Sequence, residues 1–151
     1  MIKIICIGKL KEKYLSDAEK EYLKRLKKYT TLEVIELNDS NIDDEKIALE
    51  KEKEQILRYL KPKEYLITLE IEGKQLSSME LADKIDKTLI TNSDITFIIG
   101  GSYGIHPSIK EKSNFKLSFS KMTFPHQLFR ILLLEQLFRS YKILNHEKYH
   151  K

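Results

Sequence analysis

The sequence contains a single cysteine and no long run of apolar residues. Its longest uninterrupted apolar stretches are strand-length or shorter, well below the ~20 residues that span a bilayer, which argues against an integral membrane protein. The opening run at 2–8 also lacks the length and the small-residue cleavage site of a secretory signal, so we expect a cytoplasmic protein. Cys6 lies within this run, which favours a buried, unreactive thiol over a disulfide or a nucleophile.

Internal repeats, low-complexity linkers and domain boundaries are also missing from the sequence. Of the 151 residues, 41% are hydrophobic and 33% are charged, which is too apolar for a disordered chain. A chain of this length buries about 70% of its unfolded surface when it folds as one unit. We therefore expect a single domain over residues 1–151.

Positive charge is concentrated near the C-terminus. Residues 110–151 contain nine Lys or Arg and three acidic residues, a net charge of +6, whereas residues 1–109 contain 18 Lys or Arg and 20 acidic residues, a net charge of −2. All four histidines, at 106, 126, 146 and 150, also lie in the last third of the chain. This asymmetry would steer a polyanion such as RNA to that third, although a lysine-rich sequence also scatters positive charge without binding one.

Apolar and polar patterns predict alternating strands and helices. Strands are expected at 2–8, 32–37, 64–71, 94–99 and 115–119, and helices at 16–29, 43–60, 77–90, briefly after Pro107, and from Pro125 onward. Two helices begin with the spacing of a capping box, at Ser16–Glu19 and Ser77–Glu80. The highly charged stretch 50–54 is expected to be a solvated helix face. This alternation predicts an α/β fold, with a mostly parallel sheet covered by helices on both faces.

The last helix has an unusually wide apolar face. At 100° per residue its apolar side chains cover an arc of roughly 160°, wider than the ~100° that packing on one core requires; they are Ile131, Leu133, Leu134, Leu137, Phe138, Tyr141 and Leu144. The excess predicts a homodimer through this helix. Arg130 lies in the same arc, so either its stem is buried and its head reaches a rim, or it meets an anion.

A glycine-rich turn, Gly100-Gly101-Ser102-Tyr103-Gly104, directly follows the fourth expected strand. Glycines at the carboxyl edge of a parallel sheet let the backbone pass close to a small molecule. The turn matches neither G-x-G-x-x-G, nor G-x-x-x-x-G-K-[ST], nor the G-x-S-x-G nucleophile elbow, which weakens dinucleotide, nucleoside triphosphate and serine-hydrolase interpretations. A tight turn without any ligand stays an alternative.

The C-terminal residues His146-Glu147-Lys148-Tyr149-His150 match H-E-x-x-H, a zinc-binding pattern when it lies on a helix. Only Lys151 follows, so no third ligand lies downstream, and a fraying terminus does not support a catalytic metal. We expect no metal site.

Four segments together resemble a known family. They are Thr68-Leu69-Glu70-Ile71-x-Gly73-Lys74, Ile98-Ile99-Gly100-Gly101-Ser102-x-Gly104, Phe119-Ser120-Lys121-Met122-Thr123-Phe124-Pro125-His126-Gln127 and Tyr149-His150-Lys151. In this order and spacing they resemble the ribosomal RNA large subunit methyltransferase H family of the SPOUT class. The resemblance covers essentially the whole chain, including 8–14, although the segment 38–43 is shorter than in many relatives and His146 has no counterpart in the motif.

The resemblance implies a homodimer whose C-terminal part forms a trefoil knot that holds S-adenosylmethionine. The cofactor-binding residues it implies are Leu69, Gly100, Gly101, Gly104, Phe119, Ser120, Lys121, Met122, Thr123 and Phe124. The implied reaction is methylation of N3 of a pseudouridine in 23S ribosomal RNA, on the assembled ribosome. Among the tail residues that match the family, His150 is the candidate base; alternatively it only positions the RNA, and water or a substrate phosphate takes the proton. Tyr149 orients or stacks on the target and Lys151 binds substrate, while Arg130, from the apolar arc, is a further candidate for substrate binding.

Two alternatives stay open. A nucleotide-dependent α/β enzyme would use the turn Gly100–Gly104 for phosphate and would be indifferent to S-adenosylmethionine. An inactive ribosome-binding protein would keep the basic C-terminal third but transfer no methyl group.

Overall fold

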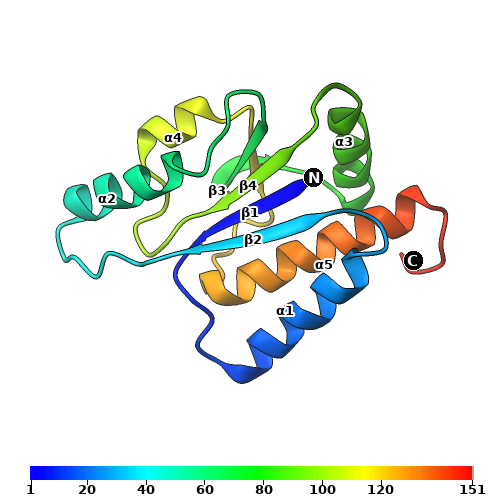
Figure 1. The fold of residues 1–151 in the computed structure, drawn as a ribbon, viewed down its shortest axis with the longest axis horizontal. Coiled ribbons are helices and arrows are strands. Elements are labelled where there is room, and N and C mark those ends of the chain that lie inside the picture. The colour runs from blue at the N-terminus through cyan, green and yellow to red at the C-terminus, as the bar shows by residue number, and fades with distance from the viewer. Residues whose placement is uncertain (151) are drawn as a thin grey trace.

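A computed structural model describes residues 1–150. These residues form five strands and five helices (Figure 1). In chain order they are β1 (Ile2–Ile7), α1 (Lys13–Leu26), β2 (Leu32–Leu37), α2 (Glu45–Leu57), β3 (Tyr65–Gln75), α3 (Ser78–Thr91), β4 (Ile95–Ile99), α4 (Pro107–Lys112), β5 (Phe115–Ser118) and α5 (His126–Leu144).

The five strands form one sheet in the order β2-β1-β4-β3-β5, and every pair of neighbours is parallel. β1 and β4 are buried along their whole length, as expected of central strands in a parallel sheet covered on both faces. All carboxyl ends therefore meet at one edge, where the loops after β1, β3, β4 and β5 gather.

Helices cover both faces of the sheet. On one face, β4 Phe97 and β1 Ile4 belong to the same buried cluster as side chains of α1, α3 and α5. On the other face, β1 Ile5 and β4 Ile98 pack with Ile56 of α2 and Ile109 of α4. The predicted α/β fold with a parallel sheet and helices on both sides is confirmed; the trefoil knot stays a prediction. Within residues 1–150, no helix is both long and apolar enough to cross a membrane.

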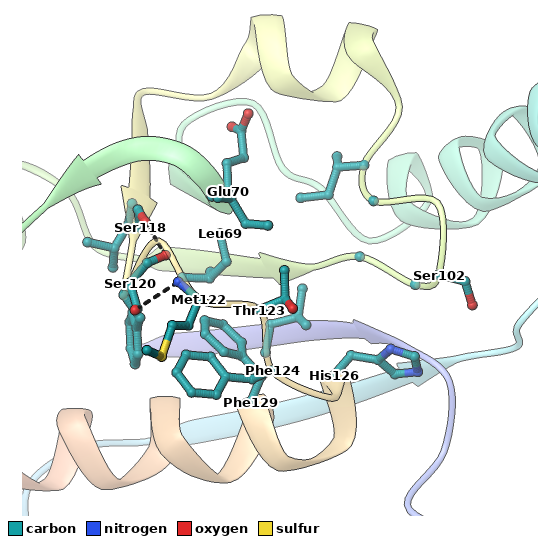
Figure 2. Close-up of a pocket in the computed structure, with 18 residues that line it drawn as sticks. Leu69, Glu70, Ser102, Ser118, Ser120, Met122, Thr123, Phe124, His126 and Phe129 are labelled. Atoms are coloured by element: carbon teal, nitrogen blue, oxygen red, sulfur yellow. Dashed lines mark hydrogen bonds between the residues drawn. The ribbon is translucent and has the colours of Figure 1, made fainter.

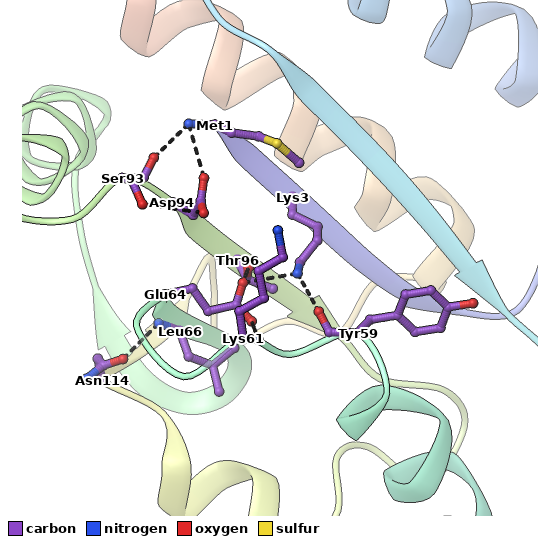
Figure 3. Close-up of polar contacts among 10 residues, drawn as sticks. All are labelled: Met1, Lys3, Tyr59, Lys61, Glu64, Leu66, Ser93, Asp94, Thr96 and Asn114. Carbon is purple, nitrogen blue, oxygen red and sulfur yellow. Dashed lines mark hydrogen bonds and ion pairs between the residues drawn. The ribbon is translucent and has the colours of Figure 1, made fainter.

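At the amino edge of the sheet, a buried ion pair joins β1 to the start of β3 (Figure 3). Lys3 Nζ lies 3.0 Å from Glu64 Oε2 and also donates to the Tyr59 carbonyl. Glu64 accepts from Thr96 Oγ1 at 2.7 Å and from the Lys61 N–H at 2.8 Å. Both charged side chains are almost fully buried, so these partners are needed to offset their desolvation.

The predicted capping box at α1 is wrong, whereas the one at α3 is confirmed. α1 begins at Lys13, which places Ser16 inside the helix, and the Glu19 carboxylate contacts Arg130 at 3.0 Å instead of the helix backbone. At α3, the Ser77 hydroxyl accepts from the Glu80 N–H at 3.1 Å, and Glu80 accepts from the Ser77 N–H at 2.8 Å.

The charged stretch in α2 is only partly solvated. Glu52 is 4% exposed and shares the inward face of the helix with Ala48 and Ile56, at spacings of four residues. The expectation of a wholly solvated face is therefore wrong for Glu52, because the helical period turns this residue toward the sheet. α2 is also shorter than predicted, with Asp44 as its N-cap accepting from the Ile47 N–H at 3.1 Å.

β3 extends four residues beyond its predicted end at Ile71, to Gln75, because it pairs with β5 again after an irregularity in the ladder. Its pairing with β5 shifts register between Leu69 and Lys74, so the intervening residues leave the ladder before pairing resumes. A Cβ atom on Gly73 would lie 2.7 Å from the Lys116 carbonyl oxygen, which explains why glycine stands there.

The wide apolar arc of α5 is accounted for within one chain. α5 packs against the sheet and lies between α1 and α3, and six of the seven arc residues are buried by these neighbours: Ile131, Leu133, Leu134, Leu137, Phe138 and Tyr141. The arc therefore no longer argues for a second copy of the chain.

Candidate functional site

A cavity of about 330 Å³ lies at the carboxyl edge of the sheet, where the ends of β3, β4 and β5 meet the start of α5 (Figure 2). Its walls include nine of the ten residues predicted to bind the cofactor. The tenth, Lys121, does not line the cavity. The nine are Leu69, Gly100, Gly101, Gly104, Phe119, Ser120, Met122, Thr123 and Phe124. The fold thus brings together three segments that are far apart in the sequence, although their ligand stays a prediction.

The turn after β4 closes on itself and needs its glycines. The Gly104 N–H donates to the Gly101 carbonyl at 3.0 Å, and Gly104 has a φ of +81°, which disfavours other residues. A Cβ atom on Gly100 would lie 2.6 Å from the Gly104 carbonyl carbon and 2.9 Å from Ile105 Cγ1. Any side chain at Gly100 would therefore force the turn open.

Residues in and just before α2 contact this turn on the side away from the cavity. Tyr103 donates its hydroxyl to the Asp43 carbonyl at 3.1 Å, just before α2. A Cβ atom on Gly101 would lie 3.6 Å from Glu52 Oε1, a buried oxygen that has no hydrogen-bond partner within residues 1–150. Burial, together with the nearby Asp39 carboxylate, raises the pKa of Glu52, and the Ser40 hydroxyl opposes the rise by donating at 3.3 Å.

The segment after β5 forms the opposite wall of the cavity. Ser118 Oγ donates to the Ser120 carbonyl at 3.1 Å, and Ser120 Oγ accepts from the Met122 N–H at 3.0 Å (Figure 2). Below this turn, the ring of Phe129 lies 4.8 Å from that of Phe119 and 6.0 Å from that of Phe124, measured between centroids. The wall thus combines exposed backbone groups with an aromatic cluster.

Nine further lining residues were not among those predicted to bind the cofactor: Glu70, Ile71, Ile99, Ser102, Ile105, Leu117, Ser118, His126 and Phe129. Glu70 lies in the register shift of β3, and its carboxylate points toward α4, where Lys110 Nζ is 3.7 Å away (Figure 2). His126 begins α5 and faces the loop after β1, since a Cβ atom on Gly8 would lie 3.9 Å from the imidazole. His126 and Phe129 could have been included in the predicted site, because they lie only two and five residues beyond the predicted segment 119–124.

Tyr149 and His150 lie away from the cavity, against the C-terminal half of α5. Tyr149 donates its hydroxyl to Glu135 Oε2 at 2.9 Å, and His150 Nδ1 lies 3.0 Å from Arg139 Nη1. Burial and the bond to Glu135 raise the pKa of Tyr149. Arg139 is 13 residues beyond His126, or about 20 Å along the helix axis. The structure does not bring these two candidate catalytic residues to the candidate cofactor site of the same chain.

Arg130 meets anions that belong to its own chain. Its Nη1 lies 2.6 Å from Glu36 Oε2 and 3.0 Å from Glu19 Oε2, and its Nη2 donates to the Gly8 carbonyl at 3.0 Å. The residue is 2% exposed. These contacts join α5 to α1, β2 and the end of β1, and substrate binding by Arg130 stays a prediction. Lys151 lies outside the described residues.

The H-E-x-x-H sequence is not helical in the structure. α5 ends at Leu144, and His146 has a φ of +56°. Among residues 1–150, no three His, Cys, Asp or Glu side chains are grouped as metal ligands.

Comparison with known proteins agrees with this geometry. Residues 1–150 match the family model described as Predicted SPOUT methyltransferase. Ribosomal RNA large subunit methyltransferase H of Clostridium acetobutylicum is 48% identical over 99% of both chains, and that of Caldicellulosiruptor saccharolyticus is 44% identical over 100% of both. A protein of Methanococcus maripaludis, whose name also refers to this methyltransferase, is 56% identical over 99% of both chains.

A solved structure of a methylase family protein from Haemophilus influenzae Rd KW20 has a similar fold. It superposes with a TM-score of 0.58 over 99% of this chain and 70% of the other, at 14% sequence identity. This likeness concerns the fold, whereas the sequence relatives extend over the full chain. The chain therefore belongs to the SPOUT methyltransferase family, within the ribosomal RNA large subunit methyltransferase H group.

Proposed function

We propose that this protein transfers a methyl group from S-adenosylmethionine to N3 of a pseudouridine in large-subunit (23S) ribosomal RNA, and that it acts as a homodimer on the ribosome. The observation that carries the proposal is the cavity at the carboxyl edge of the sheet. Its walls contain nine residues that the family resemblance assigns to cofactor binding, in a chain whose relatives are named as ribosomal RNA methyltransferases.

The cavity suits a ligand with an aromatic base and a short polar tail. Its volume, about 330 Å³, lies at the lower end of the range for small-molecule sites. Leu69, Leu117 and Ile99 offer apolar surface, while the turns at 100–104 and 118–122 present backbone groups. Backbone N–H and C=O groups can form hydrogen bonds with the edge of an adenine ring and with the methionine part of the ligand, so charged side chains are not needed. Lys121, outside the cavity, is left to contact the phosphates of the substrate.

The main tasks of the protein in this reaction are to align the methyl donor with its acceptor and to accept a proton. The bound sulfonium supplies an activated methyl group, so the carbon–sulfur bond breaks as the carbon–nitrogen bond forms, and S-adenosylhomocysteine leaves. The protein must hold N3 in line with that bond and accept the N3 proton. We assign proton removal to His150 and orientation of the target base to Tyr149, since a neutral imidazole nitrogen can accept a proton and a phenol ring stacks on bases.

This assignment calls for a second copy of the chain, because the tail is docked away from its own cavity. The Tyr149 hydroxyl is bonded to Glu135, which is nine residues, or about 14 Å along the axis of α5, beyond His126. A partner related by a two-fold axis, with its α5 antiparallel, would place its tail near this cavity. Exposed apolar side chains at the start of α5, Phe124 and Leu128 among them, would supply contact area.

Two measurements test the proposal. Calorimetry with S-adenosylmethionine and with ATP should show binding of the first alone, because a nucleotide-dependent enzyme would prefer the second. Methyl-labelled cofactor should then label ribosomal RNA in ribosomes that lack the modification. Cofactor binding without any transfer of label would instead favour an inactive ribosome-binding protein.

A further inference from the structure

The loop between β1 and α1 lies at the edge of the cavity, although the candidate site does not include it. Gly8, with a φ of +103°, turns the chain as it leaves β1 and faces the His126 imidazole. His126 lines the cavity, so the residues that follow Gly8 begin their path beside the cavity mouth.

Three hydrogen bonds hold this loop in place. The Gly8 carbonyl accepts from Arg130 Nη2 at 3.0 Å, and the Lys11 N–H donates to Gln127 Oε1 at 2.8 Å. Between them, the Leu10 N–H donates to Glu36 Oε2 at 3.3 Å, and Leu10 packs at the margin of the core. Arg130 and Gln127 thus hold the loop against the start of α5, and the side chains of Lys9 and Lys11 are exposed.

Apart from the Glu12 carboxylate, the exposed side chains of this loop have the chemistry of a nucleic-acid contact. Lys9 and Lys11 are exposed. The Lys13 side chain is 88% exposed and contacts the Asp17 carboxylate at 2.6 Å. Tyr14 is 70% exposed, an unusual state for a large aromatic residue. Lysines bind phosphates without regard to sequence, and an exposed aromatic ring stacks on an unpaired base.

We propose that Lys9, Lys11 and Tyr14 form the RNA-binding edge of the cavity, the two lysines contacting phosphates and Tyr14 stacking on a base next to the methylated nucleotide. This inference rests on the proposed function. The charge distribution alone predicted RNA binding by the C-terminal third, and this loop adds an N-terminal segment to the RNA-binding surface. Lys121, from the opposite wall, would complete a basic rim around the cavity mouth.

The test compares three variants with wild type on ribosomes lacking the modification: Lys9→Ala with Lys11→Ala, Tyr14→Ala and Tyr14→Phe. Lys63→Ala with Lys87→Ala is the matched control, because these exposed lysines lie away from the carboxyl edge, before β3 and near the end of α3. Calorimetry gives the cofactor Kd, light scattering gives the oligomeric state, and sedimentation gives ribosome binding as a function of salt.

The lysine variant should lose about tenfold or more in kcat/KM for ribosomes, with an unchanged cofactor Kd and a salt dependence of binding reduced by about two in slope. Tyr14→Ala should weaken ribosome binding, Tyr14→Phe should restore it, and the control should match wild type. Unchanged ribosome binding in the lysine variant, or dissociation of a dimer by Tyr14→Ala, would overturn the proposal. If wild type binds ribosomes but transfers no methyl group, the proposed function fails, whereas the binding data still decide this surface.

Discussion

The Tyr149 hydroxyl lies 2.9 Å from Glu135 Oε2, so the C-terminal tail is docked midway along α5 and not at the cavity near the start of that helix. Its ring packs edge-on against Phe138 at 5.1 Å and beneath the Arg139 guanidinium at 4.8 Å. The tail residues with candidate catalytic roles therefore lie along the C-terminal half of α5, and the candidate cofactor site lies at the start of that helix.

The first prediction is that the tail acts on the partner subunit's cavity. His150→Ala and Gly100→Leu should each be inactive, the second because its side chain would collide with the Gly104 backbone. If the tail acts in trans, an equal mixture of the two variants that exchanges subunits freely should recover about a quarter of wild-type activity, since half the dimers are mixed and each carries one complete site. Methyl transfer to ribosomes measures the recovery.

A tail that acts within its own subunit would leave the mixture inactive, because no mixed dimer would then hold a complete site. Light scattering of each variant is the control, since a variant that fails to dimerise would also fail to complement.

The second prediction concerns the buried pair of Lys3 and Glu64 (Figure 3). Lys3→Met should lower the free energy of unfolding by about 3–5 kcal/mol, because it leaves the Glu64 carboxylate buried without a cation. The double variant Lys3→Met with Glu64→Gln should regain more than half of that loss, since the uncharged amide keeps partners in Thr96 and Lys61. Urea denaturation measures both, and a single variant within about 1 kcal/mol of wild type would contradict the account.

The third prediction is that Cys6 is unreactive in the folded protein. Burial raises the pKa of its thiol to about 12, so the thiolate is scarce at any ordinary pH, and the side chain is only 2% exposed. A thiol reagent such as DTNB at pH 8 should label Cys6 only as the chain unfolds. Rapid, complete labelling of the native protein would show that the thiol is accessible.

The fourth prediction concerns Glu52, whose pKa is raised by burial. Because its folded pKa lies above the ordinary glutamate value of 4.5, this group favours folding below that pH, and the benefit is lost as pH rises through the folded pKa. Glu52→Gln cannot ionise, so its stability relative to wild type should be greater at pH 8 than at pH 4.5. Thermal unfolding at both pH values measures this, and a difference that does not change with pH would contradict it.

The sequence predicts the elements well where the signal is local. β1 and β4 are short β-branched runs because they are buried on both faces, and the Ser77–Glu80 capping box depends only on residues within one helical turn. The candidate site was also predictable as a set of segments, since the carboxyl ends of parallel strands share one edge.

The features that sequence reasoning missed depend on distant contacts. Glu19 has the spacing of a capping box, but Arg130, 111 positions later, takes its carboxylate. Glu52 resembles its charged neighbours in sequence, yet the packing of α2 turns it inward. From the sequence alone, the wide apolar face of α5 predicts a partner subunit. In the structure α1 and α3 pack on either side of this helix, and the sequence does not show that arrangement.

The decisive experiment for the proposed function is transfer of label from methyl-labelled S-adenosylmethionine to ribosomes that lack the modification, followed by mass mapping of the ribosomal RNA. We expect one labelled nucleotide in the large-subunit RNA, a pseudouridine carrying the methyl group on N3, and no label with Gly100→Leu. Label on another nucleotide or on protein, or none at all from folded wild-type protein, would contradict it.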